Sequence, residues 1–440
     1  MRDFPSGFHP HRPRWRRNTL ASCLSVALPL AAASQDASAL IDGAQTASVL
    51  TVMNCNNDGT DSLREAVTAA ADGTVVDMTG LMCSTITLAS PLVIDHAVAN
   101  LTVNGPLDHA LTITANYGSR VFVHNAEGTL TLDHLTITKG DINSGDHGGG
   151  CIYGLGSVAL NHSTVSLCGV NLPSGNFISG GGIYAHGNLT LTDSVVSFNH
   201  AYSPSGGATG GGVATHGNLT CTRSSILNNV ALGSSASSGG ASVEGSAELY
   251  ACTISDNQSN DFVGGLYVGA STTCTNSTIS YNNATTLAGG IFAAAPLTLD
   301  HCTIAFNTSY QPFGAGVISQ VSLVANSSII ANNYSTFNGA RADLLAQSSF
   351  TGSHNLIRAS SGAAVPADTI SADPLLAPLG DSGGATHTHA LLPGSPALDA
   401  GDNIHSLAWD QRGEGFPRAV GVPDIGAFED SGVIFANGFE

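Results

Sequence analysis

The chain has 440 residues, and its 13 Lys and Arg against 32 Asp and Glu give a formal net charge of −19. So acidic a chain lacks the basic surface that nucleic-acid binding requires, and its 42% of hydrophobic residues argue against charge-driven disorder. We therefore expect a folded protein with no nucleic-acid partner. Its 52 glycines and its charged fraction of only 10% favour short strands joined by many turns.

The N-terminus is organised like a secretory signal peptide. Five arginines lie within residues 1–17, and the apolar, small-residue stretch Thr19–Ala33 follows them. Ala-x-Ala sequences place the cleavage site after Ala33 or after Ala39. We expect residues 1–39 to be removed and the mature chain to be secreted or displayed on the cell surface. No other run approaches the ~18 apolar residues of a membrane span, so we expect no transmembrane segment.

Residues 40–85 are predicted to form an N-terminal cap that contains a short helix. Ser62 and Glu65 have the spacing of a capping box, and Leu63–Ala71 follows as the helix. The same region holds a candidate calcium loop with EF-hand spacing, because Asn54, Asn56, Asp58 and Glu65 could offer oxygen ligands. Glu65 is also needed by the capping box. We therefore expect no specific metal site here, only unspecific calcium binding to an acidic surface, and we predict no cofactor.

A repeated sequence unit occupies residues 86–340. Each unit opens on a glycine pair and then alternates apolar and polar residues, which indicates strands. The period of roughly 25 to 30 residues is typical of solenoids. We predict an all-β, right-handed parallel β-helix of roughly ten coils, with the short helix at one end and an irregular cap at the other. The units open at Gly148, Gly180, Gly210, Gly239, Gly264, Gly289 and Gly314.

Stacking these units in register predicts columns of like residues. An aliphatic column is expected to point into the core, and it consists of Val165, Val196, Ile226, Ile254, Ile279, Ile304 and Ile329. A column of asparagines is expected to form a structural ladder at a bend, because asparagine tolerates turn geometry and stacked amides bond to one another. Its members are Asn199, Asn229, Asn257, Asn282, Asn307 and Asn332.

Eight cysteines follow the predicted signal peptide. Cys55 with Cys83 is the favoured disulfide, since it would join the cap to the first coil, and Cys151 with Cys168 is a second candidate. Cysteines that share a column lie two coils apart, about 9.6 Å, which exceeds disulfide reach. With no C-x-x-C pair and scattered histidines, we expect no metal site. The remaining four are predicted to be unpaired buried thiols, namely Cys221, Cys252, Cys274 and Cys302.

One polar column forms the most enzyme-like group in the chain. On four successive coils, about 5 Å apart, it holds His134, His162, Asp193 and Arg223. Such a line is able to do acid–base chemistry on a sugar. A glycoside hydrolase, however, needs two carboxylates, and this line holds one, with Asp133 beside it. We favour a solvated, non-catalytic corner. The predicted column continues through Ala251, Asn276, His301 and Asn326.

Beyond the repeat, residues 341–367 are expected to connect to a C-terminal domain over residues 368–430. Because Pro374–Pro423 breaks the coil period, we expect it to cover the open end of the solenoid. Residues 431–440 form a tail, and Val433–Glu440 resembles a short terminal tag of some secreted bacterial proteins.

Three segments resemble families of secreted bacterial proteins. Asn54–Ala66 looks like the CSLREA motif, with Asp61 where its Cys often stands. The glycine-pair starts, with Phe198-Asn199 and Phe306-Asn307, are similar to the repeats of polymorphic outer-membrane proteins. Asp373–Glu429 closely resembles the choice-of-anchor Q domain. The resemblance implies a pectin-lyase-like β-helix at the bacterial surface, and it implies no catalytic residue, because these families have no agreed ones.

We expect a non-catalytic protein for adhesion or envelope contact, with a carbohydrate or another cell-surface ligand as its partner. The first alternative is a polysaccharide lyase or glycoside hydrolase that uses the polar column. Long loops walling that column, with a second carboxylate in reach, would favour this enzyme. The second alternative is a structural spacer that displays the C-terminal domain.

Overall fold

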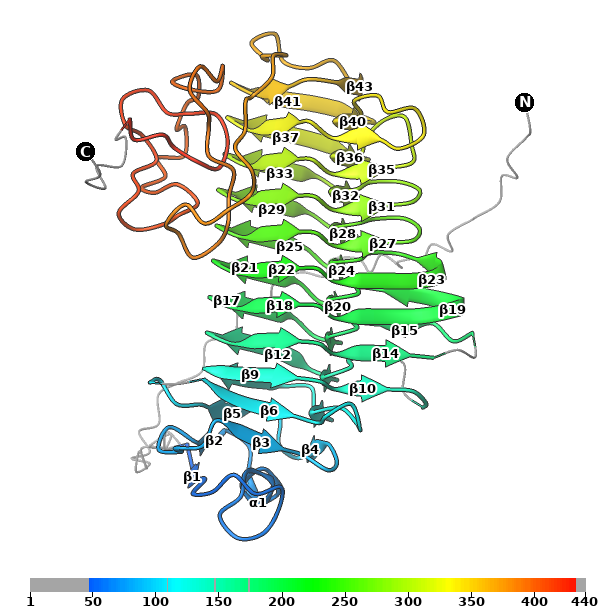
Figure 1. Cartoon of the computed structure of the whole chain (residues 1–440), viewed down its shortest axis with the longest axis vertical. Coiled ribbons are helices and arrows are strands. Elements are labelled where there is room, and N and C mark those ends of the chain that lie inside the picture. Colours follow the sequence, from blue (N-terminus) through cyan, green and yellow to red (C-terminus); the bar gives the residue numbers. More distant parts are fainter. Residues whose placement is uncertain (1–46, 109, 146–147, 173–174, 433–440) are drawn as a thin grey trace, which may run out of the picture. The chain divides into compact units, whose positions relative to one another are not determined.

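The structure, a computed structural model, describes residues 47–108, 110–145, 148–172 and 175–432. The predicted signal peptide (1–39) and residues 433–440 of the predicted tail lie outside the described residues. Across the described residues the chain winds into about 11 coils, and every named strand pairs with its neighbours in parallel (Figure 1). The predicted all-β parallel β-helix is therefore confirmed.

Four sheets run along the stack in the described part of the chain. Sheet A consists of β1 (Val49–Thr51), β2 (Thr74–Asp77), β5 (Leu101–Asn104), β8 (Thr129–Asp133), β12 (Ser157–Asn161), β17 (Leu189–Thr192), β21 (Leu219–Thr222), β25 (Ala247–Tyr250), β29 (Thr272–Thr275), β33 (Leu297–Asp300), β37 (Ser322–Asn326) and β41 (Ser349–Ser353). Sheet B consists of β3 (Thr85–Thr87), β6 (Leu111–Thr114), β9 (Leu135–Thr138), β13 (Thr164–Ser166), β18 (Val195–Ser197), β22 (Ser225–Leu227), β26 (Thr253–Ser255), β30 (Thr278–Ser280), β34 (Thr303–Ala305), β38 (Ile329–Ala331) and β42 (Leu356–Ile357).

The other two sheets complete each coil. Sheet C consists of β4 (Leu92–Ile94), β7 (Phe122–His124), β11 (Ile152–Gly154), β16 (Ile183–Ala185), β20 (Val213–Thr215), β24 (Ala241–Val243), β28 (Leu266–Val268), β32 (Ile291–Ala293), β36 (Val317–Ser319), β40 (Leu344–Ala346) and β43 (Ser360–Gly362). Sheet D consists of β10 (Asp141–Ile142), β14 (Gly169–Asn171), β15 (Ile178–Ser179), β19 (His200–Thr209), β23 (Val230–Ala236), β27 (Gln258–Ser259), β31 (Asn283–Ala284), β35 (Thr308–Ser309) and β39 (Tyr334–Ser335).

Residues that alternate along each strand point into one continuous core. The predicted aliphatic column is part of that core, and strand register places Val165, Val196, Ile226, Ile254, Ile279 and Ile304 one above another. The last predicted member is wrong, because Ile304 pairs with Ile330 and not with Ile329. The sequence holds two adjacent isoleucines at this point, and this coil has one residue more than the two coils before it. The pattern could not choose between them.

The same one-residue difference changes the asparagine ladder. Asn282 and Asn307 follow the predicted register, and the side chain of Asn307 donates to Asn333 Oδ1 at 2.9 Å. The predicted Asn332 is therefore wrong as a ladder member, since its side chain instead accepts from Arg358 Nη1. The ladder ends where Asn333 donates to the carboxylate of Asp343.

The structure pairs all eight cysteines of its described residues. Cys55 bonds to Cys83 and Cys151 bonds to Cys168, with Cα–Cα distances of 6.5 and 5.5 Å. The prediction of four unpaired thiols is wrong, because each of those cysteines is bonded to a partner in the neighbouring coil. The additional bonds are Cys221–Cys252 and Cys274–Cys302, with Cα–Cα distances of 6.4 and 6.6 Å.

The N-terminal helix α1 (Leu63–Ala69) begins at the predicted capping box. The Ser62 hydroxyl accepts from the backbone N–H of Glu65, and the Glu65 carboxylate accepts from Asp61 N–H. The helix buries Leu63 against the core. Sheet A already includes β1 and β2 in this region, so strand stacking begins within residues 40–85. Within the described residues, no helix is long and apolar enough to cross a membrane.

The C-terminal segment (residues 368–432) does not cover the end of the stack as predicted. It lies along the side of the later coils, against sheet B (Figure 1). Thr278 Oγ1 bonds to Thr388 Oγ1 at 2.9 Å, and Ala427 N–H donates to Thr303 Oγ1 at 3.0 Å. Val365, just before this segment, packs on the main core near its last coils. In the later coils the outward side of sheet B carries apolar residues, and Ile329 and Leu356 pack there with Ile425 of the segment.

Candidate functional site

The predicted polar column lies at the corner between sheets A and B. Each member follows the end of a sheet A strand and has a left-handed backbone, with φ between 45° and 53°. This conformation turns the chain from one sheet to the next, so the four side chains come from equivalent corners of successive coils. The members are His134, His162, Asp193 and Arg223.

These side chains form one connected polar network. Asp133 Oδ1 lies 2.7 Å from His134 Nδ1 and 3.4 Å from His162 Nδ1. His162 Nε2 lies 3.7 Å from Asp193 Oδ2, and the other Asp193 oxygen accepts from Arg223 Nε at 2.7 Å. The hydrogen bond to Asp193 raises the pKa of Arg223. In this arrangement Asp193 is held by a guanidinium, so it is not a free base.

The column changes character in the later coils. Ala251, Asn276 and His301 occupy the same corner with left-handed φ, but the next member is Ser327 and not the predicted Asn326. These later corners are buried, and Asn276 donates to the backbone oxygen of Trp409 in the C-terminal segment. Of the described members of this column, only the group from His134 to Arg223 therefore faces solvent together.

The candidate calcium loop does not assemble around a common point. Asn54 donates to the backbone oxygen of Thr60 and accepts from the N–H of Asn56. Glu65 is engaged by the backbone at Asp61. The carboxylate of Asp58 accepts from Asn57. The polar groups of this loop are thus directed to separate partners.

A second site, which the sequence reasoning missed, lies over sheet C. The middle residue of each sheet C strand faces outward, and register stacks Tyr153 on Tyr184 and Tyr267 on Phe292. Their ring centroids are 5.4 and 5.7 Å apart. Between these two aromatic pairs the column holds the small residues Ala214 and Ser242. The interruption leaves a gap of three strand spacings, roughly 14 Å, between Tyr184 and Tyr267.

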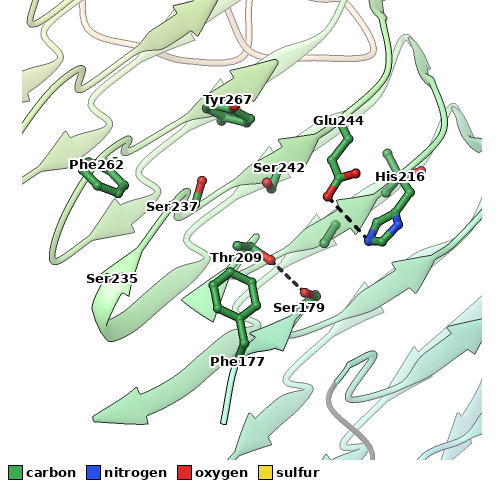
Figure 2. A pocket seen from close by; sticks show the side chains of 12 residues that line it. Phe177, Ser179, Thr209, His216, Ser235, Ser237, Ser242, Glu244, Phe262 and Tyr267 are labelled. Carbon is green, nitrogen blue, oxygen red and sulfur yellow. Dashed lines mark hydrogen bonds and ion pairs between the residues drawn. The ribbon is translucent and has the colours of Figure 1, made fainter. Parts of the chain in front are cut away.

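This gap is the floor of a groove of about 660 Å³, which we call the sheet C groove. Its walls come from the extended sheet D strands β19 and β23 and from the loops beside them, and Figure 2 shows the aromatic rings of Phe177, Phe262 and Tyr267 around it. Phe177 is 58% exposed and Phe262 is 42% exposed. Hydroxyl-bearing residues complete the lining, namely Ser179, Thr209, Ser235, Ser237 and Ser242.

One end of the groove carries a polar pair. His216 Nε2 lies 3.6 Å from Glu244 Oε1 and 3.3 Å from the Tyr184 hydroxyl. Burial, with the nearby Tyr153 and Glu244, raises the pKa of Tyr184, so this phenol stays protonated and can donate. Among the described lining residues, Glu244 is the only carboxylate and there is no Lys or Arg.

The sequence contained a signal for this groove. Three of the four aromatic residues follow the aliphatic residue after a glycine pair, as in Gly-Ile-Tyr at Tyr184 and Gly-Leu-Tyr at Tyr267. The units that open at Gly180 and Gly210 are longer than the three units that follow them. Their additional residues form the long strands β19 and β23. Reading the outward column together with unit length would have located the site.

Comparisons with known proteins assign no family to this chain. No protein-family model and no curated protein matches the chain. The chain is similar to a solved structure titled "Crystal structure of pectate lyase Pel9A", with 12% identity and a TM-score of 0.43, over 87% of this chain and 97% of that one. A likeness this distant says nothing of activity. The resemblances to the CSLREA motif, the outer-membrane repeats and the choice-of-anchor Q domain stay predictions.

Proposed function

We propose that this is a secreted or cell-surface, non-catalytic β-helix protein that binds a polysaccharide in the sheet C groove. The observation that carries the proposal is the interrupted aromatic column, which leaves a groove with aromatic rings at its sides and hydroxyl groups on its floor and walls. Four disulfides support a location in an oxidising compartment, because cytosolic proteins rarely keep them.

The lining matches the two surfaces of a sugar. A pyranose ring presents C–H groups on its faces and hydroxyl groups at its edge. Aromatic rings such as Phe177 and Phe262 suit the faces, while Ser237 and Thr209 suit the edge through hydrogen bonds. The single acid Glu244 and the net charge of −19 favour a neutral polysaccharide over an acidic one.

The lining does not match hydrolysis or elimination. Glycoside hydrolases generally use two carboxylates about 5–9.5 Å apart, and the described lining residues offer only Glu244. An elimination on an acidic sugar needs a group that neutralises its carboxylate, and these lining residues hold no Lys or Arg. The expected role is therefore binding without turnover.

The test fills the groove from its floor. Ser242→Tyr continues the aromatic column across the gap, and we expect it to weaken binding of neutral polysaccharides about tenfold or more while the protein stays folded. The matched control is Val93→Tyr, which adds the same ring to the same face on β4, outside the groove. Binding is measured by affinity electrophoresis and by calorimetry against neutral and acidic polysaccharides.

Three outcomes would contradict the proposal. If Ser242→Tyr binds polysaccharides as tightly as the unaltered chain, the binding site lies outside the sheet C groove. Release of reducing ends or of unsaturated uronic products, abolished by Glu244→Gln or by Asp193→Ala, would show an enzyme. No binding to any polysaccharide would favour the structural spacer.

A further inference from the structure

We propose that Asp133, His134 and His162 bind a divalent transition-metal ion, with Zn²⁺ as the best match. One ligand atom from each of these residues lies within 4.8 Å of the others. The sequence pattern places these three residues together at the polar column, where we considered them for acid–base chemistry and not as metal ligands. The proposal is independent of the sheet C groove.

The backbone builds the site at two adjacent corners. Asp133 is the last residue of β8, and the next two coil corners carry His134 and His162. The two imidazole rings are stacked, with centroids 4.5 Å apart and planes 17° from parallel. Both Nδ1 atoms lie near Asp133 Oδ1, at 2.7 Å for His134 and 3.4 Å for His162. The three donor atoms are close enough to surround one ion, which would replace the contacts that the two histidines now make with Asp133.

The ligand types select the metal. Imidazole nitrogen suits zinc, copper and nickel, whereas calcium and magnesium prefer oxygen. Two histidines and one carboxylate leave a fourth tetrahedral position open for water. The exposed fraction of the side chain is 29% for His134, 51% for His162 and 31% for Asp133, so an ion can reach these residues from solvent. A shallow hollow of about 400 Å³ beside both histidines gives room for that water.

A second layer of residues orients one ligand. Asp193 Oδ2 faces Nε2 of His162 at 3.7 Å, and Arg223 in turn holds Asp193. With Nε2 directed at a carboxylate, Nδ1 of His162 is left for the metal. A carboxylate behind a metal-bound histidine is the usual way in which proteins fix the ring and its tautomer.

Two similar groups elsewhere lack one part of this geometry. The rings of His186 and His216 also lie close, with centroids 4.9 Å apart, but Glu244 approaches His216 alone, at 3.6 Å. His301, which follows Asp300 as His134 follows Asp133, is fully buried under the C-terminal segment. Neither group offers three convergent, accessible donors.

The test uses the full chain without a histidine tag. Calorimetry with Zn²⁺ should show one saturable site per chain, and Co²⁺ should give the visible absorption of a tetrahedral ion. We expect His162→Asn and His134→Asn each to weaken Zn²⁺ binding at least about tenfold. The matched control is His96→Asn, because His96 lies beside Asp95 at 2.8 Å but has no second histidine. This control should bind Zn²⁺ like the unaltered chain.

X-ray absorption of the zinc-loaded protein should report two imidazole ligands. Thermal unfolding with a chelator present checks that each variant is folded, and Asp133→Asn replaces any variant that is not. Absence of a saturable site would overturn the proposal, as would undiminished binding by both histidine variants. Loss of binding in His216→Asn but not in His162→Asn would also overturn it. Polysaccharide binding should be unchanged in His162→Asn, which separates this site from the groove.

Discussion

At the scale of single residues, the asparagine ladder shows how one side chain serves two coils. The Oδ1 atom of Asn257 accepts from both the backbone N–H and the side-chain amide of Asn229, each at 3.0 Å. Its own amide nitrogen donates to Asn282 Oδ1 and to the backbone oxygen of Ile226, each at 2.9 Å. Because Asn257 is fully buried, water cannot replace any of these bonds.

We predict that Asn257→Ala lowers the free energy of unfolding by about 2–4 kcal/mol. The reason is that the substitution leaves buried donors and acceptors of Asn229, Ile226 and Asn282 without partners. Urea unfolding followed by circular dichroism measures the change. The control is Asn143→Ala, since Asn143 is exposed and its amide contact to Asp141 is 3.4 Å long. A loss below ~1 kcal/mol for Asn257→Ala would show that the ladder is not a stabilising network.

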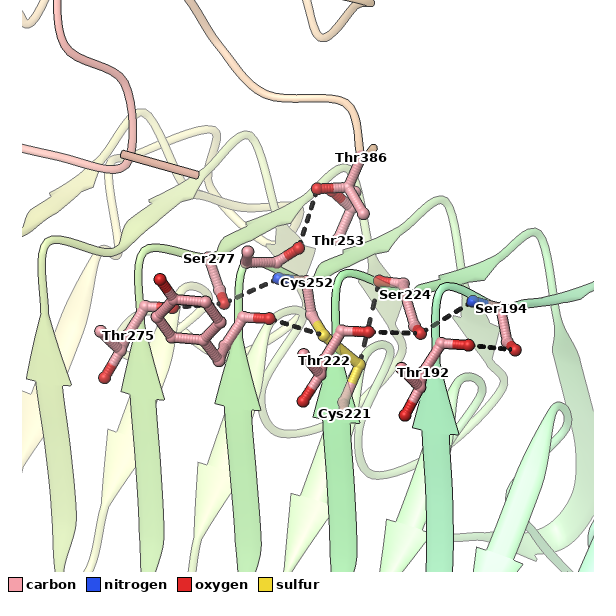
Figure 3. The surroundings of a disulfide bond; sticks show 12 residues. Thr192, Ser194, Cys221, Thr222, Ser224, Cys252, Thr253, Thr275, Ser277 and Thr386 are labelled. Atoms are coloured by element: carbon pink, nitrogen blue, oxygen red, sulfur yellow. Dashed lines mark hydrogen bonds between the residues drawn. A yellow bond between two sulfur atoms is a disulfide. The ribbon is translucent and has the colours of Figure 1, made fainter. Parts of the chain in front are cut away.

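At the scale of strands and corners, the Cys221–Cys252 and Cys274–Cys302 disulfides occupy positions that other coils fill with leucine and serine. Cys221 stands in sheet A between Leu191 and Leu249. Cys252 stands in an inward corner column, and Figure 3 shows it beside Ser224 and Ser277 of the same column. An inward cysteine one residue before the end of a sheet A strand therefore lies diagonally opposite a corner cysteine of the next coil. Comparing only the members of one column cannot reveal that diagonal.

We predict that Cys221→Leu combined with Cys252→Ser folds normally but is less stable by about 3 kcal/mol. The leucine and serine restore the residues of neighbouring coils, so packing and the serine hydrogen bonds are kept. The loss is that of a cross-link over 31 residues, which restricts the unfolded chain. Thermal unfolding of the variant is compared with that of the unaltered chain. An unchanged midpoint would mean that this cross-link adds no stability.

At the scale of the whole described molecule, the C-terminal segment is a cover with a polar underside. Arg418 is fully buried and pairs with Glu429 at 2.9 Å. His389 is buried between the segment and β30, with Nε2 2.8 Å from Ser280 Oγ, and burial lowers its pKa to about 4. Burial and the Arg418 charge lower the pKa of His301 to about 3. Both imidazoles are therefore neutral while the segment is docked.

We predict that acid releases this segment. An undocked histidine takes up a proton near pH 6.5, whereas the docked forms of His301 and His389 do not until about pH 3 and 4. The undocked state thus binds more protons, and docking weakens as the pH falls from about 6.5 to about 4. Asp424 has the opposite effect on docking. Burial raises its pKa to about 6, so the docked carboxyl takes up a proton before the undocked one does, and this favours docking as the pH falls from about 6 to about 4. The two histidines outweigh this single group.

Limited proteolysis of residues 368–432 across this pH range measures the release. His389→Gln keeps a partner for Ser280 but cannot be protonated, so we expect it to move the release to lower pH. His96→Gln, at a histidine whose side chain is 84% exposed, is the control and should not move it. Release at the same pH in both variants would show that His389 does not govern docking.

The repeat pattern alone was sufficient to predict that the chain winds as a parallel β-helix. Glycine pairs, alternating apolar residues and a regular unit length leave one way to bury the apolar side chains, which is to stack the units in parallel. Two register errors arose where identical neighbours made the register ambiguous, at Ile329 and Ile330 and at Asn332 and Asn333. Both members of each pair fit the sequence pattern equally well, and only the hydrogen bonds to the adjacent coil distinguish them.

Local periodicity thus determined the solenoid, its inward columns and the capping box at Ser62, because each depends on residues in one unit or its immediate neighbour. The tertiary structure decided how Cys221 finds Cys252, which atoms of the two histidines approach Asp133 and where the C-terminal segment lies. It also decided that the sheet C groove exists, since its walls and floor come from different sheets. These features depend on how side chains from separate faces approach in space, and a one-dimensional pattern carries no information about that approach.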